Sequence, residues 1–226
     1  MELLKGVHVI PTYANCTLLV DDKVLLFDTS QKDIDTRVLP YLRKVGIQPK
    51  DLTAIIATHT HPDHVNGLAT VKQQAPSARV AAHEADADFI SHKAKAYPHK
   101  PLNGMPSPWT AVPVDDRLRD GQRYEGFRVL HLPGHTPGSI ALLDEDRGLL
   151  IAGDTICTDS ESTDDPDLLR EVGVAPMSDA FNSDPAQHRA NIKKLAGFAF
   201  EVAIPGHGEP LAREASKKVQ ALARRL

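Results

Sequence analysis

Short apolar runs alternate with amphipathic stretches along the chain, which predicts a mixed α/β fold with strands and helices in alternation. The run LTAIIAT (52–58) is apolar along most of its length, as expected of a strand buried on both faces. Asp33 can cap a helix through IDTRVLPYLRKV, although Pro40 interrupts its middle and Gly46 favours its end. Further strands are predicted at 7–11, 14–20, 23–28, 78–82, 127–132, 139–144, 148–153 and 200–205, and further helices at 66–74 and from Glu84, Pro185 and about Arg213.

Two segments carry little periodicity. Residues 93–113 are rich in proline and are expected to form a long excursion loop. Residues 158–184 are acidic and looser, and their TDSESTDDPD stretch lacks the ligand spacing and central glycine of a calcium loop. We interpret that stretch as a solvated surface loop. Neither a repeat nor an inter-domain linker is evident, so one domain spanning 1–226 is expected.

The amino-acid composition and net charge of the chain limit the classes of function that we expect for it. The 226 residues are 41% hydrophobic and 25% charged, which is ordinary for a soluble globular protein. A net charge of -4 gives no general attraction to nucleic acid or anionic lipid. The N-terminal stretch lacks the features of a signal peptide, and no apolar run approaches the length of a membrane span. Cys16 and Cys157 are expected to be free thiols. We therefore expect a cytoplasmic protein with a small-molecule substrate, with a homodimer left open.

The stretch THTHPDHVNG (58–67) crowds His59, His61, Asp63 and His64 into six positions. Such crowding suggests a shared metal ion. A chain of this composition would contain HxHxDH by chance on the order of a few times in a thousand, so a purely structural role is the weaker interpretation. The remaining histidines are interpreted as surface or internally satisfied residues: His8, His83, His92, His99, His131 and His188.

Three later strands each end in a glycine followed by a side chain that can bind metal. These side chains are His135 in PGHTPGS, Asp154 in AGDT and His207 in PGHG. Side chains at strand ends can converge on one edge of a sheet system, which predicts a single site fed by all seven residues. Seven ligands are too many for one four-coordinate zinc but suit two ions about 3.5–4 Å apart. Imidazole with carboxylate favours zinc, iron or manganese.

The motifs THTHPDH, PGHTPGS, AGDT and PGHG, in that order, resemble those of the metallo-β-lactamase-fold hydrolases. The resemblance covers nearly the whole chain and implies a four-layer αββα sandwich with metals at one edge between two sheets. It implies that His59, His61 and His135 hold one metal and that Asp154 bridges two metals. It further implies that the second metal is held by Asp63, His64 and His207.

The same residues indicate which branch of the metallo-β-lactamase-fold hydrolases the chain resembles. The lactamases of this fold usually lack the bridging aspartate seen here as Asp154, and flavodiiron reductases usually have glutamate where His61 stands. The fold's nucleases carry large insertions or basic arms, and glyoxalase II adds a helical domain, whereas only one helix is expected after His207. The resemblance therefore favours small lactonases and thioesterases. The sequence TICTDSEST departs from the tyrosine that many lactonases carry after the bridging aspartate.

These features predict a hydrolase in which a metal-bridged hydroxide attacks an ester, lactone or thioester of a small molecule. Asp63 is the predicted proton carrier. A mononuclear-iron persulfide dioxygenase and a non-catalytic metal-binding sensor on the same scaffold are the alternatives. The predicted substrate-binding residues, which could instead seal an edge of the sandwich, are Tyr97, His99, Met105, Trp109 and Phe181.

Overall fold

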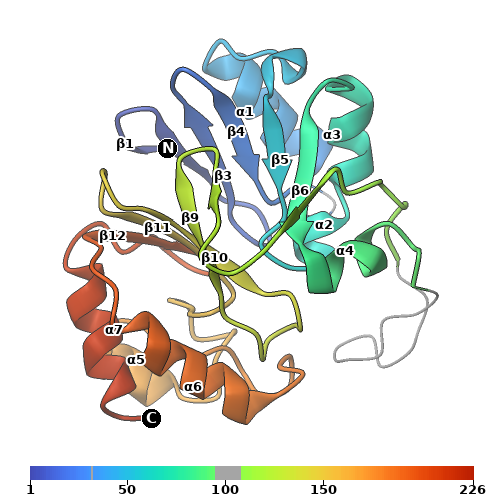
Figure 1. Ribbon diagram of the computed structural model, residues 1–226. Coiled ribbons are helices and arrows are strands. Elements are labelled where there is room, and N and C mark those ends of the chain that lie inside the picture. The colour runs from blue at the N-terminus through green and yellow to red at the C-terminus, as the bar shows by residue number, and fades with distance from the viewer. Residues whose placement is uncertain (32, 95–107) are drawn as a thin grey trace. The chain divides into compact units, whose positions relative to one another are not determined.

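The computed structural model describes residues 1–31, 33–94 and 108–226 (Figure 1). By their internal contacts the described residues form two compact units. The first unit comprises residues 1–94 and 108–117, and the second comprises residues 118–226. Each unit is built on its own β-sheet.

Among the described residues, seven strands form the sheet of the first unit, in the order β1 to β7. Strands β1 to β4 pair antiparallel, whereas β4, β5 and β6 run parallel. The carboxyl ends of β4, β5 and β6 therefore meet at one edge of the sheet. The strands are β1 (Glu2–Leu4), β2 (Val7–Ile10), β3 (Cys16–Val20), β4 (Val24–Phe27), β5 (Ala54–Ile56), β6 (Arg79–His83) and β7 (Asp116–Leu118).

Helical segments connect the parallel strands and bury apolar side chains against them. Leu18, Leu26 and Ile55 of the sheet share one core cluster with Leu42 and Val71 of two helices. Burial of these apolar side chains is the main favourable contribution to folding of this unit. The helical segments are η1 (Ile34–Val38), α1 (Leu39–Lys44), η2 (Pro49–Asp51), α2 (Pro62–Val65), α3 (Leu68–Gln74) and α4 (Glu84–Ile90).

The helix predicted after Asp33 differs from expectation in its first half. It begins as the π-helical turn η1, and the α-helix starts only at Leu39, so Pro40 lies in the first turn of α1. A proline is tolerated there because its missing N–H would have no intrahelical partner. The capping prediction for Asp33 was wrong, since its side chain makes no cap hydrogen bond.

The second unit holds a five-stranded sheet, counted over the described residues, in the order β12-β11-β10-β9-β8. Its pairs are antiparallel except β11 with β12, which run parallel. Since β9 and β11 are both antiparallel to β10, the carboxyl ends of β9, β11 and β12 lie at one edge. The strands are β8 (Arg123–Tyr124), β9 (Phe127–His131), β10 (Ile140–Asp144), β11 (Leu149–Gly153) and β12 (Val202–Pro205).

Three helices gather beside this sheet in Figure 1: α5 (Pro166–Val172), α6 (Pro185–Leu195) and α7 (Ala215–Ala223). Ile192 of α6 and Val219 of α7 share a core cluster with Leu150 of β11. Asp165 caps α5 through the Leu168 N–H at 2.8 Å. The first turns of α5 and α6 are thus started by an acidic residue followed by proline.

The mixed α/β class with two sheets is confirmed, and most predicted strands fall within a residue or two of the observed ones. The prediction missed β1, β7 and β8, which are short or edge strands, and helices α2 and α5. The expectation of one domain over 1–226 stays a prediction. In the described part of the chain, every helix is too short or too polar to cross a membrane.

Candidate metal centre

The histidine motif occupies the carboxyl end of β5 and the short helix α2 that follows it. His59 and His61 precede α2, and Asp63 and His64 lie within it. The ring centroid of His59 lies 4.0 Å from that of His64 and 4.8 Å from that of His61. The three histidines are buried, whereas the side chain of Asp63 is 16% exposed. The first unit thus brings its four predicted ligand residues together.

Asp28 lies at the end of β4. Hydrogen bonds that begin at its carboxylate determine which ring nitrogen carries the proton in His59 and in His64. Its carboxylate accepts from the Thr58 backbone N–H and hydroxyl, each at 2.8 Å, and lies 2.9 Å from His64 Nδ1. Because a carboxylate only accepts, Nδ1 of His64 carries the proton. The Thr58 hydroxyl has given its one proton to Asp28, so it accepts from His59 Nδ1 at 3.1 Å. Neutral His59 and His64 therefore keep the Nε2 lone pair for a metal.

The second unit gathers its three predicted ligand residues around one carboxylate. His135 lies between β9 and β10, Asp154 follows β11, and His207 follows β12. Asp154 Oδ2 is 3.1 Å from His135 Nε2 and 3.5 Å from His207 Nε2. On the other side of its ring, His135 Nδ1 is 2.8 Å from Asn182 Oδ1.

Both clusters direct imidazole Nε2 atoms at carboxylate oxygens. In the first unit, His64 Nε2 is 3.7 Å from Asp63 Oδ2, and in the second the corresponding partners are His135 and Asp154. A neutral imidazole that donates through Nδ1 presents a lone pair at Nε2, which repels a carboxylate unless a cation lies between them. Imidazole and carboxylate are the ligands that zinc, iron and manganese accept together. The residues of each cluster therefore fit divalent transition-metal ions.

Neither cysteine belongs to these clusters. Cys16 is buried in the core of the first unit. The Cys157 thiol lies 3.6 Å from the Ala175 carbonyl oxygen and 3.5 Å from that of Pro176, to which it donates. Burial raises the pKa of the Cys157 thiol, so it stays protonated and is a poor metal ligand.

The predicted substrate-binding residues differ in their surroundings. Trp109 is buried in the core of the first unit, where its indole N–H donates to the Ile90 carbonyl at 3.3 Å. The role of Trp109, as a substrate contact or as a residue that seals an edge, stays a prediction. Phe181 is 41% exposed in the second unit. Tyr97, His99 and Met105 lie outside the described residues.

Sequence reasoning missed Asp28 and Asn182. Asp28 carries the same signal that singled out Asp154, a carboxylate at the end of an apolar strand, and could have been found. Asn182 lies 47 residues from His135 in a segment without periodicity, so no sequence signal links the two.

His188 was also misjudged as a surface or satisfied residue. It is fully buried in α6, its ring centroid is 6.1 Å from that of His135, and neither ring nitrogen has a hydrogen-bond partner among the described residues. Burial, followed by the nearby His135, lowers the pKa of His188 to about 3. His188 is therefore a neutral core imidazole.

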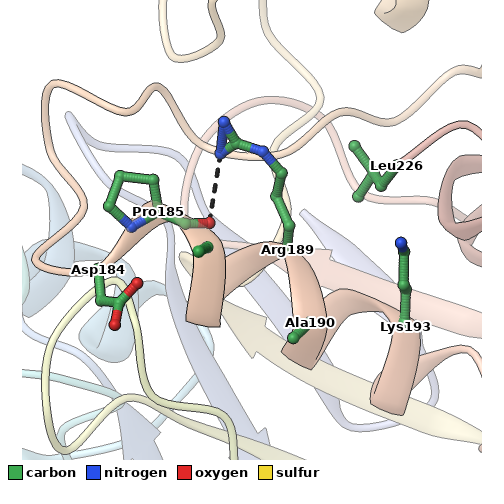
Figure 2. Close-up of a pocket in the computed structure, with 7 residues that line it drawn as sticks. Asp184, Pro185, Arg189, Ala190, Lys193 and Leu226 are labelled. Atoms are coloured by element: carbon green, nitrogen blue, oxygen red, sulfur yellow. Dashed lines mark hydrogen bonds between the residues drawn. The ribbon is translucent and has the colours of Figure 1, made fainter.

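A surface pocket of the second unit lies along α6 (Figure 2). Arg189 reaches back to the Pro185 carbonyl at 3.3 Å, and its guanidinium also pairs with both carboxylate oxygens of Asp179 at 2.7 Å. Arg189 thereby anchors the end of the acidic segment to α6. The lining residues are Asp184, Pro185, Ala186, Arg189, Ala190, Lys193 and Leu226.

Comparison with known proteins decides the family. Residues 9–207 match the model of the metallo-beta-lactamase superfamily. The chain belongs to this superfamily. YobT of Bacillus subtilis, an uncharacterized protein, is 31% identical over 144 residues, which are 62% of this chain and 60% of YobT. A hydroxyacylglutathione hydrolase of Photobacterium profundum is 28% identical over 165 residues, 73% of this chain and 51% of that enzyme. The matched part thus spans about half to three fifths of these relatives.

Solved structures share this fold. The crystal structure of the metallo-beta-lactamase family protein TTHA1429 from Thermus thermophilus aligns with a TM-score of 0.70 at 23% identity, covering 99% of this chain and 80% of TTHA1429. The crystal structure of TTHA1623 in a di-iron-bound form aligns with a TM-score of 0.69 at 23% identity, covering 97% of this chain and 99% of TTHA1623. The family model confirms the superfamily predicted from the four motifs, and the solved structures confirm the predicted fold class.

Proposed function

We propose that the two clusters together hold a pair of divalent transition-metal ions, zinc first, with iron or manganese as the alternatives. The observation that carries this proposal is the pairing, in each unit, of an imidazole Nε2 with a carboxylate oxygen. TTHA1623, which shares the fold, is described as di-iron-bound. His59, His61 and His135 would hold one ion, Asp63, His64 and His207 would hold the other, and Asp154 would serve as a ligand for both.

We infer that the chain is a hydrolase acting on an ester, lactone or thioester of a small molecule. When bound, the two ions supply a hydroxide nucleophile near neutral pH and stabilise negative charge on the substrate oxygen. Asp63 is suited to carry the proton because it is the most exposed residue of the first cluster. Its carboxylate accepts a proton during attack and passes it to the leaving group. Asp28 keeps His59 and His64 oriented throughout.

Among the three substrate classes, we favour a thioester. The supporting observation is the relative named hydroxyacylglutathione hydrolase, since an acylglutathione is a thioester. Phe181 offers an exposed apolar surface for an acyl group in the second unit. Tyr97, His99 and Met105 stay predicted substrate contacts.

The test joins metal analysis to a substrate panel. Protein purified without added metal is analysed for zinc, iron and manganese, and then assayed on matched aryl ester, lactone and acylglutathione substrates. We expect about two ions per chain at saturation and hydrolysis that stops after chelation and returns with metal. A single iron per chain together with oxygen consumption on a persulfide would replace the hydrolase by the dioxygenase. Metal without turnover of any substrate would favour the sensor.

A further inference from the structure

The segment 182–191 holds the loop that carries His135. The Ser183 backbone N–H and hydroxyl both donate to the His135 carbonyl oxygen, at 3.1 and 2.8 Å. The Asp184 N–H donates to the Gly134 carbonyl oxygen at 2.8 Å. Successive carbonyls of this loop are therefore bound by successive residues of one segment.

The loop also packs closely on the start of α6. Gly134 has φ +125, and a Cβ there would lie 2.3 Å from the His188 backbone nitrogen. The Asn191 side-chain amide donates to the Pro133 carbonyl oxygen at 2.6 Å. Only glycine permits this conformation and this approach, so the backbone of the loop has little freedom. The remaining freedom of the His135 side chain is the rotation and protonation of its ring.

Asn182 acts on that ring. It is fully buried, its Nδ2 donates to the Met177 carbonyl oxygen at 3.1 Å, and its Oδ1 lies 2.8 Å from His135 Nδ1. A carbonyl oxygen only accepts, so Met177 fixes which end of the amide faces it. The amide oxygen must then face His135, and Nδ1 must donate the hydrogen bond. The neutral ring consequently has its lone pair at Nε2, on the side of Asp154.

We propose that Asn182 is the positioning residue of His135, because its amide oxygen holds the ring in the Nδ1–H form and presents Nε2 to the ion. The proposal rests on the proposed function in one respect, that His135 binds metal. The proposal also assigns a function to the segment 158–184, because this segment supplies both Asn182 and the Met177 carbonyl that orients the Asn182 amide. Loss of such a contact behind a ligand typically lowers metal affinity about 10–100-fold.

The experiment measures zinc affinity by competition with a chromophoric chelator, and the absorption spectrum of the cobalt-substituted protein. Asn182→Ala should bind one of the two ions about 10–100-fold more weakly and change the cobalt bands. Asn182→Asp keeps an oxygen for Nδ1–H but loses the donor to Met177. It should melt at a lower temperature yet bind zinc within about threefold of wild type. Ser183→Ala, the matched control, removes a hydrogen bond to the His135 backbone only and should bind both ions normally.

Wild-type affinity in Asn182→Ala, or an equal loss in Ser183→Ala, would overturn the positioning role. A loss in Asn182→Asp as large as in Asn182→Ala would also overturn it, since the accepting oxygen would then be irrelevant. If Asn182→Ala does not fold, Asn182→Thr serves in its place, because its hydroxyl ends one bond short of the ring. Wild-type protein that takes up no zinc or cobalt refutes the proposed function instead, so the two failures are distinguishable.

Discussion

At the scale of single residues, Asp63 stands apart from its neighbours in α2. Its side chain is 16% exposed while that of His64 is fully buried, and the two groups are 3.7 Å apart. A ligand that reaches solvent can exchange protons, whereas a buried one can only coordinate. We therefore propose two separable tasks for Asp63, metal ligand and proton carrier, which a change to asparagine divides because the amide keeps one ligating oxygen but neither gains nor loses a proton near neutral pH.

Asp63→Asn should retain most of the metal and lose on the order of 10²-fold or more in kcat. The loss should be smaller for a nitrophenyl ester than for an alkyl ester or lactone, because nitrophenolate leaves without a proton. Steady-state kinetics with matched leaving groups, on protein of measured metal content, provides the check. Equal losses for all leaving groups would show that Asp63 only positions metal.

Trp109 belongs to the core of the first unit rather than to an exposed surface. It is 3% exposed and bonds to the Ile90 carbonyl. Trp109→Ala should lower the free energy of unfolding by about 3–5 kcal/mol, the usual cost of truncating a buried aromatic residue. Denaturant titration measures this, with Phe181→Ala as the control that changes stability little. Unchanged stability in Trp109→Ala, with an altered KM, would instead support Trp109 as a substrate-binding residue.

At the scale of elements, hydrogen bonds connect distant residues within the acidic segment 158–184. The Ser178 hydroxyl donates to Asp164 Oδ1 at 2.7 Å, and the Asp179 N–H donates to Asp164 Oδ2 at 2.8 Å. Ser162 and Thr163, within the stretch interpreted as solvated, are each only 8% exposed. The segment is therefore an ordered connection between β11 and α6.

The two hydrogen bonds, from Ser178 first and then from Asp179, lower the pKa of Asp164. Because the carboxyl pKa is lower in the folded state, the ionised group stabilises the folded protein at pH values above its unfolded pKa of 3.8. This stabilisation is lost as the pH falls through the folded pKa. Asp164→Ala should speed amide exchange of residues 178–179 about fivefold, the equivalent of roughly 1 kcal/mol. Exchange mass spectrometry should give a constant ratio to wild type from pH 5 to 8. Glu161→Ala, an exposed acidic change in the same segment, should have no effect.

At the scale of the whole molecule, each unit supplies only part of the ligand set that we propose. The proposed centre requires both sets, so a change in either unit should affect the same ions. Metal that binds only the folded state also stabilises that state by mass action.

His59→Ala in one unit and His135→Ala in the other should each lose an ion and most of the zinc-dependent rise in Tm. The double variant should lose little more than either single variant, since residues of one site are not additive. Calorimetry with and without zinc measures this, and His92→Ala, an exposed histidine, serves as the control. Independent, additive losses would mean two separate metal sites, one per unit.

The sequence by itself singled out the candidate ligand residues and determined most strands. His59, His61, Asp63 and His64 are adjacent along the chain, and His135, Asp154 and His207 each follow an apolar strand, so covalent spacing alone singles them out. Which nitrogen the rings of His64 and His135 present was decided by tertiary structure. Asp28 reaches His64 across 36 residues and Asn182 reaches His135 across 47, through contacts that no local pattern encodes. Burial of Trp109 was equally undetermined, because it depends on packing from distant segments of the first unit.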